Sequence, residues 1–103
     1  MNEISPILFF KQYQKNFNIK VIDIRMPNEF EEYHIVDAIN IPYDLLRNEH
    51  HLFMNKSYTY YIICKNGDKS YHATKFLMKY GYNVVNVIGG MEHWRGNVVT
   101  NIC

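Results

Sequence analysis

Short apolar runs alternate with segments of helical periodicity along the chain. Three runs rich in β-branched residues, 21–24, 59–63 and 84–88, are too brief for buried helices and predict buried strands. A fourth short strand is expected at 38–42, where Pro42 stops it. Because these runs alternate with helices, the chain is expected to form βα units. The predicted class is therefore an α/β fold with a central, mostly parallel sheet flanked by helices.

The first helix is expected to begin after Ser5, to end at Asn18 and to cover one face of the sheet. Ser5 is a favourable N-cap residue, and Pro6 suits the first helical position because it lacks an amide hydrogen that would be unpaired there. Apolar side chains then recur at roughly helical spacing, at Ile7, Phe10, Tyr13 and Phe17.

A longer helix is predicted to end near Gly81, a residue that favours the left-handed conformation found after helix C-termini. Shorter helices are expected at 27–33 and 91–95, and another after Asp44, which can cap it, whereas 96–103 has no clear pattern. The longer helix is indicated by apolar residues at positions i, i+3, i+4 and i+7, namely Ala73, Phe76, Leu77 and Tyr80.

The sequence changes from strand to helix around Cys64. The apolar run stops at this cysteine, a polar loop turns on Gly67, and a helical pattern follows. A side chain in this position is expected among backbone N–H groups at the positive end of a helix dipole, which favours thiolate over thiol. Lys65 and Lys69 add positive charge on either side of the glycine. The loop therefore predicts a nest for an anion, whether sulfur, phosphate or carboxylate.

Simpler interpretations exist for each candidate residue. Cys64 has an alternative as a buried structural cysteine. Asp23 and Arg25 follow the first predicted strand and fit a catalytic role as well as a structural hydrogen-bonded pair beneath the loop. His50 and His51 beside Glu49 are candidate metal ligands, but no second cluster at ligand spacing completes a site, so a solvated turn is the simpler interpretation. His72 could donate a proton or steer a substrate, but an exposed helix position is preferred. A solvated face is the simplest interpretation for Lys56, Lys75 and Lys79.

Composition excludes several classes of protein. The 103 residues are 48% hydrophobic and 20% charged, which is typical of one folded domain, here 1–103. A net charge of +1 without a basic cluster argues against binding to nucleic acid or an anionic membrane. The chain lacks both an apolar stretch near the ~20 residues that span a bilayer and a signal-peptide pattern, so a cytoplasmic location is expected.

The two cysteines, Cys64 and Cys103, do not have the spacing of a zinc ribbon or a disulfide scaffold. Cys64 is therefore expected to stay free in a reducing compartment. Cys103 is either a resolving thiol or part of a loose tail, and the tail is the preferred interpretation.

Several segments, in order, resemble a single-domain rhodanese, a sulfurtransferase. The active-site loop of that family usually has the pattern Cys-x-x-Gly-x-Arg-Ser, and residues 64–70 are similar to it. The other similar segments are 21–25, which ends in Asp-x-Arg, 29–35, 38–42 and 81–94. Each segment is weak evidence alone, but their order and spacing together are specific.

The resemblance implies a rhodanese-like three-layer domain and sulfur transfer by a nucleophilic cysteine. In the family the loop cysteine, here Cys64, takes a sulfane sulfur from a donor such as thiosulfate or a protein persulfide. It then passes the outer sulfur to a thiol or cyanide acceptor, and neither a metal nor an organic cofactor is implied. Asp23 and Arg25 would support the site, and the substrate-binding loop would consist of Lys65, Asn66, Gly67, Asp68, Lys69 and Ser70.

The chain departs from the family pattern at charged positions. Lys65 and Lys69 stand where arginine is common, so a point charge replaces the two-pronged grip of a guanidinium on an oxyanion. Thiosulfate is therefore expected to bind poorly, which favours a persulfide or polysulfide from another protein as donor. Tyr33 and Asp37 also replace glycines that flank His34 in the usual pattern.

Two other functions remain open at this point. One is a non-catalytic rhodanese-like module that binds protein partners or senses sulfide or oxidants through Cys64. The other is a phosphatase, which is the weaker interpretation because the loop of the related dual-specificity phosphatases is one residue longer.

Overall fold

The computed structural model describes residues 2–15 and 19–100, and these residues form a five-stranded sheet, a separate two-stranded pair and five helices. All neighbouring strands of the larger sheet are parallel. The pair is antiparallel and joins β3 (His34–Ile35) to β7 (Val98–Val99). In spatial order the larger sheet consists of β1 (Glu3–Ile4), β6 (Asn83–Val87), β5 (Thr59–Ile63), β2 (Lys20–Asp23) and β4 (Ile39–Asn40).

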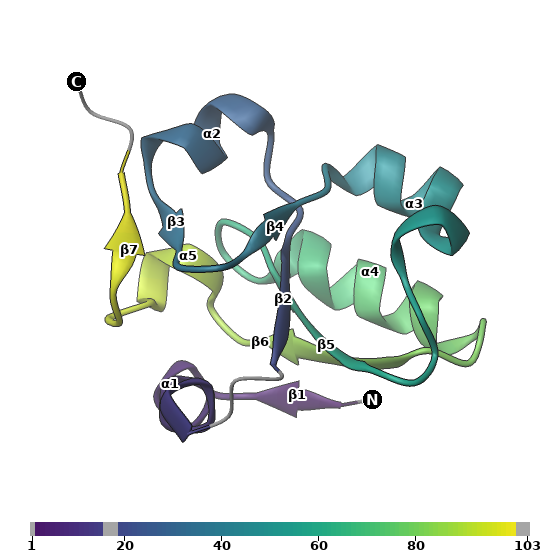
Figure 1. Ribbon diagram of the computed structural model, residues 1–103, viewed down its shortest axis with the longest axis horizontal. Coiled ribbons are helices and arrows are strands. Elements are labelled where there is room, and N and C mark those ends of the chain that lie inside the picture. The colour runs from purple at the N-terminus through teal and green to yellow at the C-terminus, as the bar shows by residue number, and fades with distance from the viewer. Residues whose placement is uncertain (1, 16–18, 101–103) are drawn as a thin grey trace.

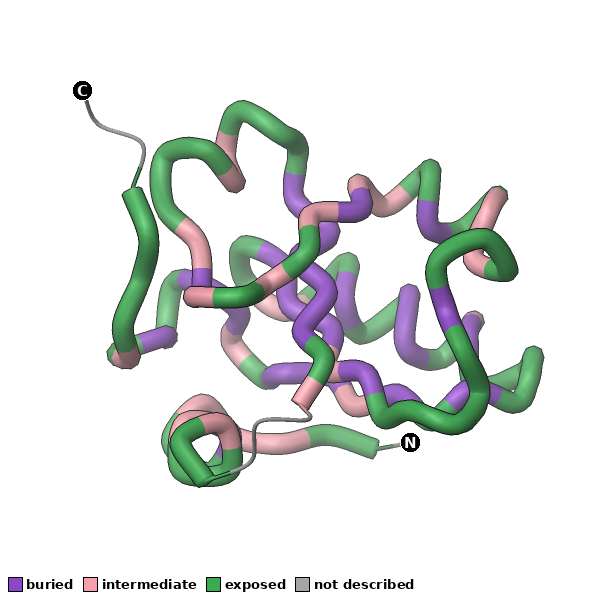
Figure 2. The backbone as a smooth tube through the Cα atoms, in the orientation of Figure 1, coloured by how far each residue is buried: buried purple, intermediate pink, exposed green. Residues whose placement is uncertain are grey.

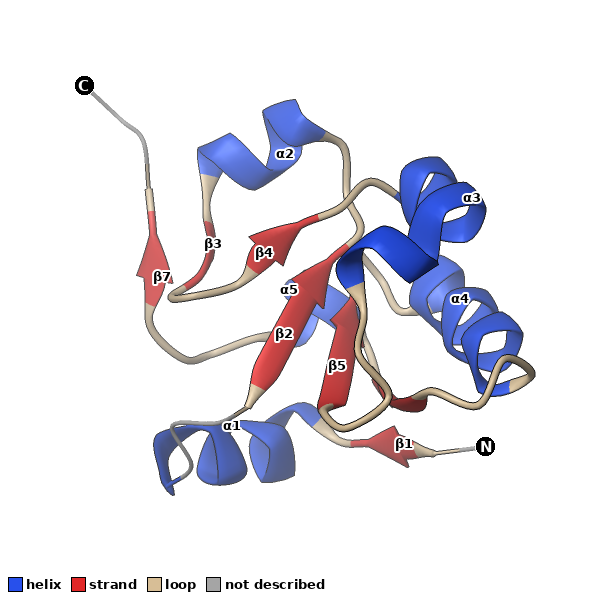
Figure 3. Ribbon diagram, turned by 45° about the vertical axis from the view of Figure 1, so that its right-hand side comes forward, coloured by secondary structure: helices blue, strands red, loops and turns tan. Residues whose placement is uncertain are grey.

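Helices cover both faces of this sheet (Figure 1). On one face lie α3 (Tyr43–Phe53) and α4 (Asp68–Met78), and on the other lie α1 (Pro6–Lys15) and α5 (Gly90–His93). The short α2 (Pro27–Glu32) follows β2 beyond its carboxyl end (Figure 3). The predicted α/β class with a mostly parallel central sheet is confirmed. None of the described helices is long and apolar enough to cross a membrane.

The alternation of side chains between the two faces of β5 determines which way the Cys64 side chain points. Tyr60 and Ile62 pack into the core beneath α3 and α4, whereas Tyr61 and Ile63 pack into the core beneath α1. Successive side chains of a strand point to opposite faces, so Cys64 continues the first series and points toward α4. Figure 2 shows how burial concentrates along these central strands.

Two hydrophobic cores hold the layers together, one on each face. Burial of aliphatic and aromatic side chains supplies the main favourable free energy of such a fold. The core under α3 and α4 includes Ile22, Leu46, Ile62, Ala73, Leu77 and Val84. The core under α1 and α5 includes Phe9, Val21, Ile35, Ile63, Val87, Met91 and Trp94.

Several element boundaries differ from the sequence prediction. Asp44 does not cap α3, because the helix already begins at Tyr43 and Pro42 occupies the N-cap position. The last short helix ends at His93 rather than at residue 95. The segment after Gly96, which has no clear pattern, contributes β7, whose two residues are too few to leave a periodic signature.

The first helix begins as predicted, since the Leu8 amide donates to Ser5 Oγ at 3.3 Å. Its buried face differs from the predicted one: Phe9 is fully buried, whereas Ile7 is 66% exposed. Phe17 and its expected end at Asn18 lie outside the described residues.

The helix after the loop also begins as predicted, and the chain reverses after it at Gly81, which has the expected left-handed backbone with φ of 86°. However, α4 itself ends at Met78, and Tyr80 lies in the following turn with 49% of its surface exposed.

Candidate active site

The Cys64 sulfur lies within a ring of hydrogen-bonding groups. The backbone amides of Gly67 and Ser70 donate to Sγ at 3.1 and 3.3 Å, and the Ser70 hydroxyl oxygen lies 3.2 Å from Sγ. Only 3% of the Cys64 surface is exposed. Amides at the start of a helix carry unpaired N–H groups and the positive end of its dipole, so this position stabilises a negative sulfur.

Gly67 gives the loop its shape. Its φ of 100° is in the left-handed region, and it occupies the N-cap position of α4. A Cβ atom here would lie 2.9 Å from the Gly89 nitrogen. The turn is completed by the Ser70 hydroxyl, which donates to the Gly67 carbonyl at 3.2 Å, and by the Asn66 side chain, which accepts from the Asp68 amide at 3.0 Å. These contacts turn two amides toward the sulfur.

The segment that starts α5 clamps the loop from outside. The Met91 amide donates to the Cys64 carbonyl at 2.8 Å, and the Glu92 amide donates to the Lys65 carbonyl at 2.9 Å. Gly90, whose φ is 60°, lies so close that a Cβ atom would collide with the Cys64 carbonyl oxygen. The sequence predicts a tight turn at this glycine pair, but its role as a clamp depends on a contact between distant segments.

Asp23 and Arg25 form a buried ion pair next to the loop. The Asp23 carboxylate accepts from Arg25 Nη2 at 2.8 Å and from Nε at 3.0 Å, and Arg25 Nη2 also donates to the Tyr33 carbonyl at 2.6 Å. Burial opposes the charge, but hydrogen bonds to Asp23 and its negative charge raise the pKa of Arg25. Of the two roles left open by the sequence, these contacts match the structural one, although Arg25 also lines the cleft described next.

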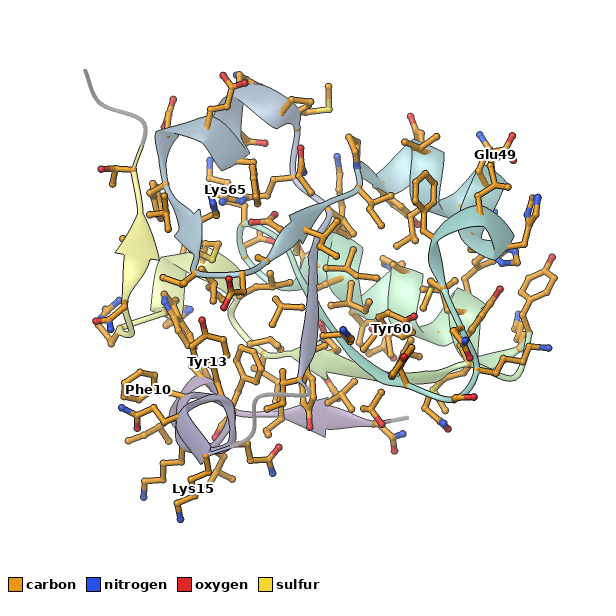
Figure 4. All side chains as sticks on the ribbon, viewed as in Figure 1. Phe10, Tyr13, Lys15, Glu49, Tyr60 and Lys65 are labelled. Carbon is orange, nitrogen blue, oxygen red and sulfur yellow. The ribbon has the colours of Figure 1, made fainter. Side chains whose placement is uncertain are left out.

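A cleft of about 550 Å³ opens beside Cys64. Its walls are the segments that follow β2, β4 and β5, because the carboxyl ends of parallel strands meet at one edge of the sheet. Lys65 extends into this cleft from the loop (Figure 4). Besides Cys64, the lining includes Arg25, Met26, Glu29, Pro42, Tyr43, Asp44, Leu45, Lys65, Asn66, Asp68 and Lys69.

The charges around this cleft are mixed. Lys65 and Lys69 contribute positive charge, but Glu29, Asp44 and Asp68 contribute carboxylates. Among the described residues, neither lysine forms an ion pair within 4.0 Å. The cleft is therefore not uniformly positive, and its attraction for small anions is limited.

The structure brings most predicted site residues together. Of the loop, Gly67 and Ser70 bind the sulfur, while the exposed side chains of its other residues line the cleft. Sequence reasoning missed the opposite wall, formed by Met26, Pro42, Tyr43 and Leu45. Their position directly after predicted strands is the signal that would have found them.

None of the histidines in the part of the chain that the structure describes lines the Cys64 cleft. His72 is exposed on α4, as expected. His50 and His51 lie in the last turn of α3 rather than in a polar turn. His51 is exposed, as expected, whereas His50 is half-buried and its Nδ1 lies 2.9 Å from the Tyr82 hydroxyl. Within residues 2–15 and 19–100, no three histidine, cysteine or carboxylate side chains are grouped to hold a metal ion.

Comparison with known proteins agrees with this geometry. The family model described as "Rhodanese-like domain" matches residues 9–97. A rhodanese-related protein from Thermoplasma volcanium has a solved structure with a TM-score of 0.87 and 29% sequence identity, covering 96% of this chain and 98% of that one. Because the family model covers most of the sequence, the chain belongs to the family of rhodanese-like domains.

The curated relatives include proteins named for sulfur transfer. The chain is 31% identical over 98 residues to a protein named "Sulfurtransferase" from Allochromatium vinosum, which covers 91% of this chain and 88% of that protein. It is 34% identical over 82 residues to "Adenylyltransferase and sulfurtransferase uba4" of Ogataea parapolymorpha, where the match covers 79% of this chain. The match covers 21% of that protein, so the chain spans only a part of the relatives in which the domain is joined to others.

Proposed function

We propose that this protein transfers sulfane sulfur through a persulfide on Cys64. The observation that carries the proposal is the position of Sγ, which receives two backbone N–H groups at 3.1 and 3.3 Å at the start of α4. A persulfide places its negative charge one atom further out, toward the cleft. Family membership and the names of relatives support sulfur transfer as the class of reaction.

The first step loads the cysteine. The Cys64 thiolate attacks the outer sulfur of a donor that contains a sulfur–sulfur bond, that bond breaks, and the remainder of the donor leaves as an anion. With thiosulfate the leaving group is sulfite, and with a protein persulfide it is a thiolate. The amides of Gly67 and Ser70 then stabilise the anionic product.

The second step unloads it. A thiophilic acceptor attacks the outer sulfur, the bond to Sγ breaks, and Cys64 returns as a thiolate. Cyanide would become thiocyanate, and a protein thiol would become a persulfide. Electrons and atoms balance without an external oxidant.

A persulfide or polysulfide is the preferred donor over thiosulfate. Lys65 and Lys69 provide point charges without the paired N–H geometry that holds an oxyanion. The cleft also carries three carboxylates, Glu29, Asp44 and Asp68, which offset the attraction of the lysines for small anions.

Intact mass after incubation with a sulfane donor tests the proposal. We expect the protein to gain the mass of one sulfur atom with inorganic polysulfide, and to lose it on addition of cyanide with release of thiocyanate. The Cys64→Ser variant should stay folded and gain no sulfur. Absence of any added sulfur on the wild-type protein with every sulfane donor would sink the proposal.

Replacement of Lys69 by arginine tests the preference between donors. The Lys69→Arg variant should use thiosulfate about tenfold better, since a guanidinium can bind two oxyanion oxygens at once. Rates of thiocyanate formation with thiosulfate and with polysulfide would be compared. Lys75→Arg on the same helix is the control. An unchanged or lower thiosulfate rate means that Lys69 does not bind the oxyanion.

A second candidate function is a module that binds a partner or senses sulfide or oxidants and does not catalyse sulfur transfer. The observation in its favour is the 3% exposure of Cys64. Alkylation by iodoacetamide distinguishes the two, because a sulfur carrier must react much faster than a buried thiol does. A phosphatase would instead hydrolyse aryl phosphates, which we expect this protein to leave intact.

A further inference from the structure

A second cleft lies beside the one at Cys64, between α3 and α4, and has a volume of about 390 Å³. Tyr43 lines both clefts, so the two adjoin. The second cleft is lined by two lysines, an arginine and a histidine and by no carboxylate, whereas the Cys64 cleft carries three carboxylates. Its lining consists of Tyr43, Arg47, His72, Lys75, Phe76 and Lys79.

The basic residues of this cleft, which we call the α3–α4 groove, are aligned. His72, Lys75 and Lys79 have the i, i+3, i+7 spacing of one helix face, and Arg47 faces them from α3. The distance along the axis from residue 72 to residue 79 is about 10 Å at 1.5 Å per residue. The groove is thus long enough for about three residues of an extended chain at ~3.3 Å each.

The cations of the groove are available to a ligand. Among the described residues, the ion pairs within 4.0 Å are Arg25–Asp23 and His51–Glu49, and neither includes Arg47, Lys75 or Lys79. All three side chains are exposed. Sequence analysis assigns Lys75 and Lys79 to a solvated face, but the fold adds Arg47 from another helix and aligns all three along one hollow.

The aromatic ring in the groove does not favour a nucleobase. The Arg47 guanidinium lies 5.0 Å from the centre of the Phe76 ring. The centres of the Tyr80 and His50 rings lie 5.1 and 6.0 Å from the centre of the same ring. Stacking of bases needs a free aromatic face, and these neighbours already surround this one. The net charge of +1 also gives no long-range attraction for a nucleic acid.

We infer that the α3–α4 groove binds an acidic segment of a protein that exchanges sulfur with Cys64. Aspartate and glutamate side chains would pair with Arg47, Lys75 and Lys79, and the shared wall at Tyr43 leads from the groove to the Cys64 cleft. In the Cys64 cleft, Glu29, Asp44 and Asp68 offset the positive charges, whereas the groove has no carboxylate, so the charge pattern favours the acidic part of the partner at the groove. The inference rests on the proposed sulfur transfer.

Sulfur transfer to synthetic peptide thiols tests the inference. Protein loaded with sulfur from inorganic polysulfide is mixed with peptides that contain one cysteine beside a run of glutamate, serine or lysine residues. We expect transfer to the glutamate peptide to be about tenfold faster than to the serine peptide, as electrostatic attraction of this kind allows. The advantage should shrink with added salt.

Charge reversal locates the effect. Lys75→Glu with Lys79→Glu should remove the advantage of the glutamate peptide while leaving transfer to cyanide unchanged. The matched control is Lys11→Glu with Lys15→Glu, which makes the same change in net charge on exposed residues of α1 across the sheet. Circular dichroism verifies that each variant is folded, and Lys75→Gln with Lys79→Gln replaces the reversed pair if it is not.

The outcomes separate this inference from the proposed function. If Cys64 never gains sulfur, the proposed function fails, and the groove is tested by fluorescence anisotropy with a labelled glutamate peptide that has serine in place of cysteine. Equal binding or transfer by the groove variant and the α1 control overturns the inference. Tighter binding of a single-stranded RNA oligonucleotide than of the glutamate peptide at the groove also overturns it.

Discussion

At the scale of single residues, the site depends on two groups that Ser70 brings to the sulfur. This serine is fully buried, its amide donates to Cys64 Sγ at 3.3 Å, and its hydroxyl oxygen lies 3.2 Å from Sγ. When the sulfur is neutral its thiol hydrogen can point to the hydroxyl, and when it is negative the hydroxyl can turn to donate. The same side chain therefore serves both protonation states.

The Ser70→Ala variant tests this contribution. A hydrogen bond to a charged group contributes about 1.5–3 kcal/mol, so persulfide formation should slow by roughly ten- to hundredfold. The rate would be followed by intact mass after mixing with polysulfide. Thr74→Ala is the matched control, because Thr74 is equally buried and its hydroxyl donates to the Ser70 carbonyl rather than to the sulfur. Equal rates in the two variants would contradict the role of the Ser70 hydroxyl.

The residues of the loop could be predicted because their signal is local. A strand that ends at Cys64, a glycine and a helix start are consecutive in the sequence, and the structure confirms β5 at Thr59–Ile63 and α4 from Asp68. The opposite wall of the cleft could not be assigned in the same way. Met26 and Tyr43 reach the cleft only because β2 lies next to β5 and β4 lies next to β2, and that order is set by packing across the whole sheet.

At the scale of elements, the start of α5 fixes the position of the loop. Amides of Met91 and Glu92 bind the carbonyls of Cys64 and Lys65, and Gly90 permits the close approach. The helix has only four residues, of which Gly90 and Met91 are buried. Its role is to satisfy loop carbonyls that point away from the sulfur, so that the loop amides remain directed toward it.

Two glycine variants separate this clamp from backbone strain alone. Gly90→Ala should lower the free energy of unfolding by about 2–5 kcal/mol, since overpacking against the Cys64 carbonyl adds to left-handed strain. Gly81→Ala, with φ of 86° and only the flexible Lys56 side chain nearby, should cost about 1–2 kcal/mol. Urea unfolding measures both. Similar losses in the two variants would mean that the close approach at Gly90 is unimportant.

Short elements were the least predictable part of the fold. β1 and β7 have two residues each, which is too few for an alternating pattern to appear in the sequence. They form because a neighbouring strand is in place, as when Glu3 and Ile4 pair with Asn86 and Val87. Longer elements, such as β5 and α4, carry enough periodicity to be identified without such neighbours.

At the scale of the whole molecule, stability is expected to depend on pH through His50. Burial, followed by the positive charge of neighbouring His51, lowers the pKa of His50 below its ordinary value of 6.5, while Glu49 raises it and Lys56 lowers it further. The folded state therefore favours the neutral ring, which lies 2.9 Å from the Tyr82 hydroxyl. Because the unfolded chain binds a proton more readily, stability falls as pH drops below 6.5 and levels off below the lowered pKa.

Urea unfolding at neutral pH and at about pH 5 tests this dependence. The wild-type protein should lose more free energy of unfolding on acidification than the His50→Gln variant, which keeps a polar side chain beside Tyr82. His72→Gln is the control, because His72 is exposed on α4. Identical pH dependence in the wild-type protein and His50→Gln would show that His50 is not responsible.

The two edges of the parallel sheet have a consequence for how such a domain is used. Both edge strands, β1 and β4, are only two residues long. An exposed edge recruits foreign strands in proportion to the length of unpaired backbone it presents, and very short edges resist this. A sheet with such short edge strands can be joined to other domains without polymerising through its edges. This property suits a domain that matches a part of longer relatives.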